Sequence, residues 1–103
     1  MMKRSRLATP DRRQAEELAI QALLFVTESE QRLSYFLNDT GVSPGELRDR
    51  AGEPGMLAAI LEHLLRNESD LLVFASGAGI EPQMVEPMRA LLAGEKKRWE
   101  PST

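Results

Sequence analysis

The side chains of this sequence that are best suited to chemistry are few and lie far apart. His63 is the single histidine, and the chain has no cysteine. Disulfides, thiolate catalysis and cysteine-ligated zinc are therefore excluded. A metal site would need several carboxylates around one imidazole, which is an unusual set of ligands. Because His63 stands between Leu61 and Leu64, we expect it to face solvent at the edge of a helix's apolar stripe.

The acidic and hydroxyl side chains form no catalytic pattern. Serine and threonine residues stand where helix caps are needed, without a second histidine or a lysine-rich pocket to activate a nucleophile. The carboxylates at positions 16, 17, 28 and 30 indicate solvated helix surface rather than a general acid–base pair. We therefore predict a non-enzymatic protein with no catalytic residue, no metal and no cofactor.

Two corners of the chain carry the apolar and glycine spacing of a helix-turn-helix motif. The same spacing arises wherever a glycine ends one helix and apolar side chains pack the corner. The two helices that would recognise DNA have mixed charge, which is poorly suited to contacts with phosphates or base edges. A nucleic-acid-binding protein that uses Arg48, Arg50 and Arg89 therefore stays the alternative function. The residues that fit the spacing are Leu37, Gly41, Val42 and Leu47 in the first corner and Ala75, Gly79, Ile80 and Val85 in the second.

Charge is distributed unevenly along the chain. Residues 1–13 have a net charge of +4 and residues 95–103 of +1, whereas residues 14–94 contain 5 basic and 13 acidic side chains. Such an acidic body matches nucleic acid poorly over its main surface. We predict a helical domain over residues 9–94, with a basic flexible tail over residues 1–8 and a second tail over residues 95–103.

Helical periodicity dominates the segment between the tails. Apolar residues recur at positions i, i+3, i+4 and i+7, and no stretch alternates with a period of two. The sequence therefore predicts an all-α fold, a compact bundle of five or six helices. The first helix should be the central and most buried one, because Ile20, Leu24 and Phe25 widen its apolar stripe. Ser43 and Glu46 predict a capping box at the start of the third helix, and Gly41 predicts the end of the second.

An internal repeat accompanies these helices. A shift of 38 positions superimposes LSYFLNDTGVSP, at residues 33–44, on LLVFASGAGIEP, at residues 71–82. We predict two three-helix pseudo-repeats, about 15–52 and 53–90, that pack around one shared core, since a solenoid needs about three copies. Positions whose residues differ between the copies should lie at the edge of the core or outside it. These pairs are Phe25 and His63, Tyr35 and Val73, and Glu46 and Met84.

Exposed aromatic side chains are the remaining functional candidates. Trp99, which cations flank in KKRWEP, is expected to lie outside the helical core. There a tryptophan either anchors a partner or folds back over the bundle. Phe25, Tyr35 and His63 join Trp99 as candidate partner-binding residues. We predict a helical adaptor that binds an unidentified partner protein or a second copy of itself.

The sequence also bears on location. The longest apolar run, residues 20–26 with Gln21 inside it, is too short to cross a bilayer. The basic N-terminus has no apolar segment behind it, so it does not resemble a secretory signal. Together with the absence of cysteine, these features predict a cytoplasmic protein without membrane contact.

Part of the chain resembles a known family. The residues that carry the resemblance include AEELAIQALLF at 15–25, LRDRA at 47–51 and LAAILEHLL at 57–65. They resemble an uncharacterised family of small bacterial all-helical proteins, known as a domain of unknown function, over roughly residues 13–93. The motif consists mostly of apolar and helix-capping residues. The resemblance therefore implies a compact helical domain and no catalytic or ligand-binding residue.

Overall fold

The computed structural model describes residues 10–94, and within them the chain is helical and has no strand. This confirms the predicted all-α class. The tails and Trp99 lie outside the described residues. The elements are α1 (Arg12–Thr27), α2 (Glu30–Thr40), α3 (Pro44–Arg50), α4 (Pro54–Leu65), α5 (Glu68–Ala78), the short 3-10 helix η2 (Pro82–Met84) and α6 (Val85–Leu92).

Reciprocal hydrogen bonds cap two of these helices. The predicted box of α3 is confirmed, because the Glu46 backbone N–H donates to Ser43 Oγ (3.1 Å) and the Ser43 N–H donates to Glu46 Oε1 (3.0 Å). Asp11 and Gln14 form a second box at the start of α1, at 2.8 and 3.0 Å. Each box satisfies backbone donors that have no partner inside the helix.

Glycines in the left-handed region end α2 and α5. Gly41 has φ 77° and Gly79 has φ 72°, so the structure confirms that Gly41 ends the second helix. The two corners differ beyond the glycine, because the first leads into α3 and the second into η2. Their helices also pack differently, since α6 buries Val85, Met88 and Leu92 whereas α3 buries Leu47. The equivalence of the two halves stays a prediction.

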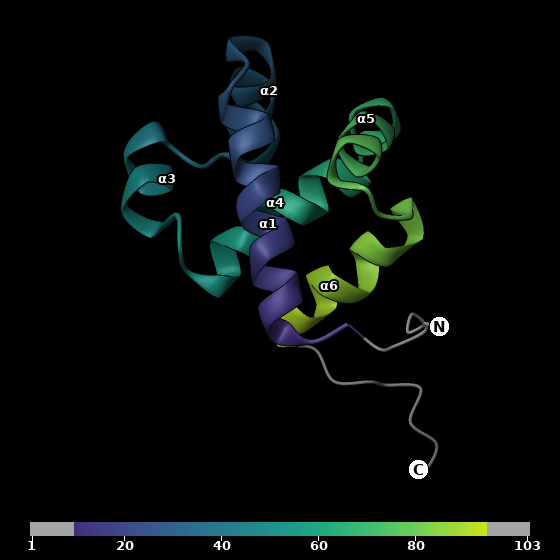
Figure 1. The fold of residues 1–103 in the computed structure, drawn as a ribbon. Coiled ribbons are helices and arrows are strands. Elements are labelled where there is room, and N and C mark those ends of the chain that lie inside the picture. The colour runs from purple at the N-terminus through teal and green to yellow at the C-terminus, as the bar shows by residue number, and fades with distance from the viewer. Residues whose placement is uncertain (1–9, 95–103) are drawn as a thin grey trace, which may run out of the picture.

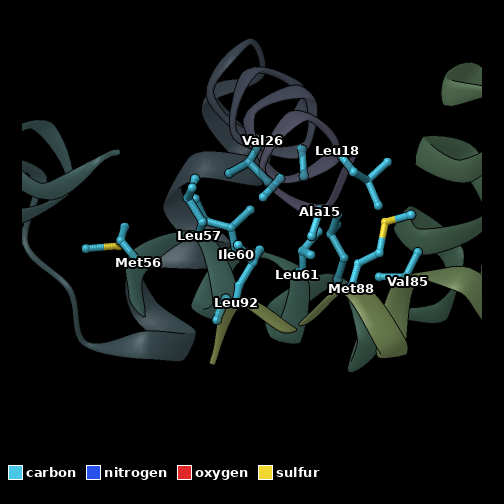
Figure 2. Close-up of a cluster of buried hydrophobic side chains, with 14 of the residues drawn as sticks. Ala15, Leu18, Val26, Met56, Leu57, Ile60, Leu61, Val85, Met88 and Leu92 are labelled. Carbon is cyan, nitrogen blue, oxygen red and sulfur yellow. The ribbon is translucent and has the colours of Figure 1, made fainter. Parts of the chain in front are cut away.

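Helix α4, which crosses behind α1 in Figure 1, is more extensively buried than α1, and this corrects the prediction that the first helix is the most buried one. Helices α1 and α4 contact each other, and each contacts α2, α5 and α6. Figure 2 shows the apolar side chains of α4 between those of α1 and α6. The buried residues of α4 are Met56, Leu57, Ala58, Ile60, Leu61, His63 and Leu64.

Helix α1 buries one face only. Small residues, Ala15, Ala19 and Ala22, form much of that face and let α1 approach the rest of the core closely. The side chains of Ile20 and Leu24 point away from it and stay about half exposed or more. The wide apolar stripe of α1 is therefore made of two parts, one buried in the core and one exposed on the surface.

Two glycines at the C-terminal end of α5, one inside the helix and one directly after it, predict opposite effects of the same substitution. Neither Gly77 nor Gly79 has an atom within 4 Å of an added Cβ, but Gly79 alone of the two has a positive φ. We expect Gly79→Ala to lower the free energy of unfolding by about 1–2 kcal/mol because of left-handed strain. We expect Gly77→Ala to raise it by about 0.5 kcal/mol because alanine favours the helix. Urea unfolding followed by circular dichroism measures both, and effects of the same sign would contradict this assignment of the helix end.

Candidate functional site

His63 lies inside the molecule, so the prediction that it faces solvent is wrong. The residue is 1% exposed. Its ring meets two aromatic rings of α2 edge-on, Tyr35 at 4.9 Å and Phe36 at 5.3 Å between centroids. Position 63 therefore belongs to the junction of α2 and α4, where a flat ring fills the space between the helices.

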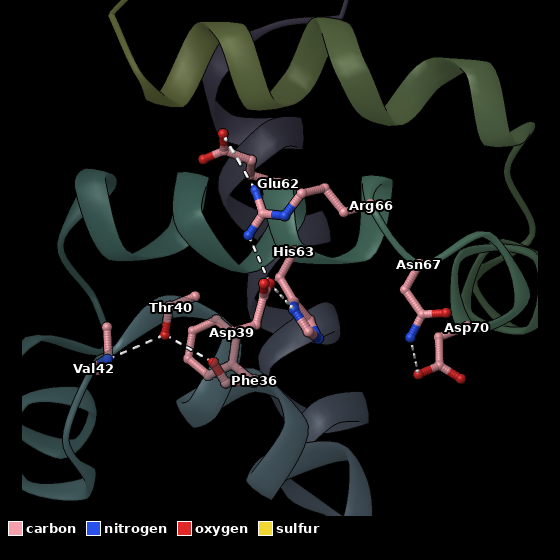
Figure 3. A network of polar contacts seen from close by, with 9 residues as sticks. All are labelled: Phe36, Asp39, Thr40, Val42, Glu62, His63, Arg66, Asn67 and Asp70. Carbon is pink, nitrogen blue, oxygen red and sulfur yellow. Dashed lines mark hydrogen bonds and ion pairs between the residues drawn. The ribbon is translucent and has the colours of Figure 1, made fainter.

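A carboxylate of α2 satisfies the buried imidazole (Figure 3). Asp39 Oδ2 lies 2.7 Å from His63 Nδ1 and 2.6 Å from Arg66 Nη2. Because an ionised carboxylate only accepts hydrogen bonds, the proton of the ring is on Nδ1 in this pair. Arg66 also lies 3.5 Å from Glu62, one turn back on α4. The network ties the end of α2 to the end of α4.

These contacts change the acidity of Asp39. The hydrogen bond from His63, followed by that from Arg66, holds the pKa of the Asp39 carboxyl below its usual range. The Asp39 carboxylate in turn raises the pKa of Arg66. The charged form of Asp39 is thus the one that the folded state favours.

The geometry gives this cluster a structural role. An enclosed imidazole does not reach a substrate, and a general base must lie within hydrogen-bond reach of the proton it removes. Among residues 10–94, no three histidine, cysteine or acidic side chains are grouped so that they would hold a metal ion. The cluster of His63, Asp39 and Arg66 therefore stabilises the contact between α2 and α4.

Phe25, a second predicted partner-binding residue, lies where α1 meets α5. Its ring contacts that of Phe74 at 5.5 Å between centroids. The guanidinium of Arg32 lies 3.9 Å from the Phe25 ring centroid and donates to the Phe25 carbonyl oxygen at 3.0 Å. Phe25 is therefore partly buried and fixed from two sides, by α5 and by α2.

The residues that precede these two phenylalanines are exposed. Leu24 is 61% exposed and Val73 is 56% exposed, the highest values among the large apolar side chains of the described chain. Successive residues of a helix differ by about 100° in direction. Each of the two therefore extends the apolar surface from the ring contact toward solvent. We call Leu24, Phe25, Val73 and Phe74 the α1–α5 seam.

The predicted partner-binding residues therefore do not form one site. Phe25 belongs to the α1–α5 seam, Tyr35 is 47% exposed beside His63, and His63 is buried. Trp99 lies outside the described residues. Sequence reasoning missed the roles of Asp39 and Phe74, which come from other helices. The internal repeat, which superimposes Phe36 on Phe74, was a signal for Phe74, and no pattern in the sequence pointed to Asp39.

The arginines of the nucleic-acid alternative do not form a shared basic face. Arg50 pairs with Glu53 at 3.2 Å, and Arg89 makes two hydrogen bonds of 2.8 Å to Glu86. Arg48 is exposed on α3, which lies on the opposite side of α1 from α6 in Figure 1. Local carboxylates therefore offset two of the three cations.

A family described as "Protein of unknown function (DUF3572)" matches residues 12–95. The chain belongs to the DUF3572 family. Comparison with curated proteins and with solved structures finds no match. Membership confirms the resemblance to a domain of unknown function and, like the resemblance, assigns no role to any residue of this DUF3572 chain.

No described helix of the DUF3572 domain is both long enough and apolar enough to cross a membrane.

Substitutions at His63 test its structural role in the DUF3572 domain. We expect His63→Ala to lower the free energy of unfolding by about 2–4 kcal/mol, because it leaves a cavity and removes a partner of Asp39. We expect His63→Phe to cost about 1–2 kcal/mol, since the ring packing remains and the hydrogen bond is lost. Urea unfolding at pH 7 measures both. A cost below about 0.5 kcal/mol for His63→Ala is typical of a surface residue and would contradict the burial.

The Asp39 carboxylate predicts a pH dependence. Because its pKa is lower in the folded than in the unfolded chain, its contribution to stability is present above the unfolded value of about 3.9. That contribution is lost as the pH falls through the folded value. We therefore expect Asp39→Asn to be much less stable than the unsubstituted chain at pH 7, with the difference shrinking below about pH 4.

Urea unfolding at a series of pH values measures this difference, and Asp49→Asn is the matched control. It removes an exposed carboxylate of α3 and so accounts for the change in net charge alone. A difference for Asp39→Asn that does not change between pH 7 and pH 3 would show that the carboxylate makes no special contact.

Proposed function

We propose that the chain is a non-enzymatic helical protein-interaction domain and that the α1–α5 seam is its contact surface. One observation carries the proposal. The two most exposed large apolar side chains of the described residues, Leu24 and Val73, flank the contact between Phe25 and Phe74. Apolar surface that spans two helices in this way is typical of protein–protein contact sites.

The energetics support the same conclusion. Full burial of one leucine or valine side chain contributes about 1.5–3 kcal/mol, so Leu24 and Val73 leave a substantial part of that free energy available to a partner. Phe25 is already held by Phe74 and by Arg32. A partner would therefore spend little conformational entropy in ordering the surface that it contacts.

We also propose that the protein is cytoplasmic and that its histidine takes no part in catalysis. The single histidine is enclosed and directs Nδ1 at Asp39, away from any substrate. The chain has no cysteine, which is compatible with a reducing compartment. The nucleic-acid alternative has less support, because Arg50 and Arg89 are paired with glutamates.

Site-specific photo-crosslinking in the cells that make the protein tests the proposal. A photoreactive phenylalanine analogue at position 24 should crosslink to a protein partner, because Leu24 extends outward from the seam. The same analogue at position 49, exposed on α3, is the matched control. We expect the crosslinked product at position 24 to fall about tenfold with Val73→Glu, which places a charge on the seam.

Circular dichroism of Val73→Glu should show an unchanged fold, since position 73 is exposed. Equal crosslinking from positions 24 and 49, or crosslinking at position 24 that Val73→Glu leaves unchanged, would exclude the seam as the contact surface.

A further inference from the structure

The chemistry around the α1–α5 seam points to one kind of partner. We infer that the seam receives a helix of another protein whose apolar stripe is bounded at both ends by lysine or arginine. The inference rests on the proposed function and adds the partner's chemistry to it.

The shape of the seam suits a helix. Helices α1 and α5 contact each other, and Phe25 and Phe74 lie in that contact. Leu24 and Val73, which precede the two phenylalanines, are the most exposed large apolar side chains of the described chain. An amphipathic helix is a usual partner for apolar side chains that two packed helices present together.

Helices α1 and α5 contribute no charged residue to the middle of the seam. Residues 18–27 of the chain and residues 71–80 each contain ten successive uncharged positions. At 1.5 Å per helical residue, each segment extends for about 15 Å. Arg32 of α2 lies against the Phe25 ring at one side of the seam and pairs with Glu28 at 3.7 Å. The two helices therefore favour an apolar stripe about three turns long.

The ends of α5 are acidic. Glu68 and Asp70 lie in its first turn, and Glu81 follows its last. Residues 67–88 contain four acidic side chains and no lysine or arginine. Cations on a partner would thus meet opposite charge at both ends of the apolar stripe, which favours association and fixes the register.

The ends of α1 are electrically balanced by comparison. Glu17 lies 3.8 Å from Arg13, and Glu28 lies 3.7 Å from Arg32. Helix α5 therefore sets the charge preference of the seam. Its 11 residues span about 16 Å, so the partner's two cationic groups should be about 11 helical residues apart.

A second copy of the chain fits this surface less well. It would present the same three carboxylates, and like charges across an interface disfavour association. The chain's own basic segment, which includes Lys96, Lys97 and Arg98, also has the required charge. Both occupants are distinguished from the proposed one by the experiment.

The test titrates full-length protein, labelled with ¹⁵N, with two synthetic helical peptides at physiological salt. Both peptides carry the same stripe of leucines, and each has one charged group at each end of the stripe, about 11 residues apart. The charged groups are lysines in one peptide and glutamates in the other. We expect the lysine peptide to shift the amide signals of residues 18–27 and 71–80 and to bind at least about tenfold more tightly than the glutamate peptide.

Two variants separate the apolar from the electrostatic contribution to binding of the lysine peptide. We expect Val73→Ser to weaken binding of the lysine peptide about tenfold, because it removes apolar contact without adding charge. We expect Glu81→Gln to weaken it about threefold and to weaken it less at high salt, where charges are screened. Asp49→Asn removes a carboxylate of α3, which is outside the seam, and should leave the affinity for the lysine peptide unchanged.

Several results would overturn the inference. Amide shifts confined to other helices, equal affinity for the two peptides, or no binding would each exclude a partner helix with cationic ends. A dimer that forms with rising concentration and shifts the same amides would show that a second copy occupies the seam. Binding of the lysine peptide only after residues 95–103 are removed would show that this segment occupies it. The proposed function fails separately, when the photoreactive analogue at position 24 of the otherwise unsubstituted chain crosslinks no more than the analogue at position 49. If the crosslink at position 24 is observed while the peptides bind equally, the seam is a contact surface for a partner of different charge.

Discussion

The burial of α4 is the constraint on which the rest of the structure depends. A helix that is apolar around most of its surface must be enclosed, and α1, α2, α5 and α6 provide the enclosure. The one buried polar side chain of α4 is His63. Its desolvation is offset only because α2 supplies Asp39 at 2.7 Å. The histidine is therefore part of the core, and it fixes how α2 lies against α4.

Enclosing one central helix leaves outer faces on the helices that surround it. On most of α2 and α3 these faces are polar, as solvent exposure requires. On α1 and α5 they keep leucine and valine beside a pair of phenylalanines. The core does not use the exposed side chains of Leu24 and Val73. In the proposed function a partner covers them, and the acidic ends of α5 would restrict the class of partner.

Local features of the fold could be predicted from the sequence, and non-local ones could not. The Ser43 capping box and the helix end at Gly41 depend on residues within four positions of each other, so their patterns are visible in the chain. The burial of His63 depends on Asp39, which is 24 residues away. The pairing of His63 with Asp39 could not be predicted from the sequence, because it depends on how α2 packs against α4. Likewise, Phe25 was a candidate by its aromatic character, but its contact with Phe74 requires α5 to pack on α1.

Solvent paramagnetic relaxation of the protein's side-chain protons, measured with a soluble gadolinium chelate, tests the central claim most directly. The claim is that His63 belongs to the core and that the functional surface is the α1–α5 seam. It predicts strong broadening of the Leu24 and Val73 methyl signals, and little or none for the His63 ring protons and the fully buried Leu64 methyls. A His63 ring that broadens as much as Leu24 would contradict the burial. Leu24 and Val73 methyls as protected as those of Leu64 would show that the chain itself covers the seam.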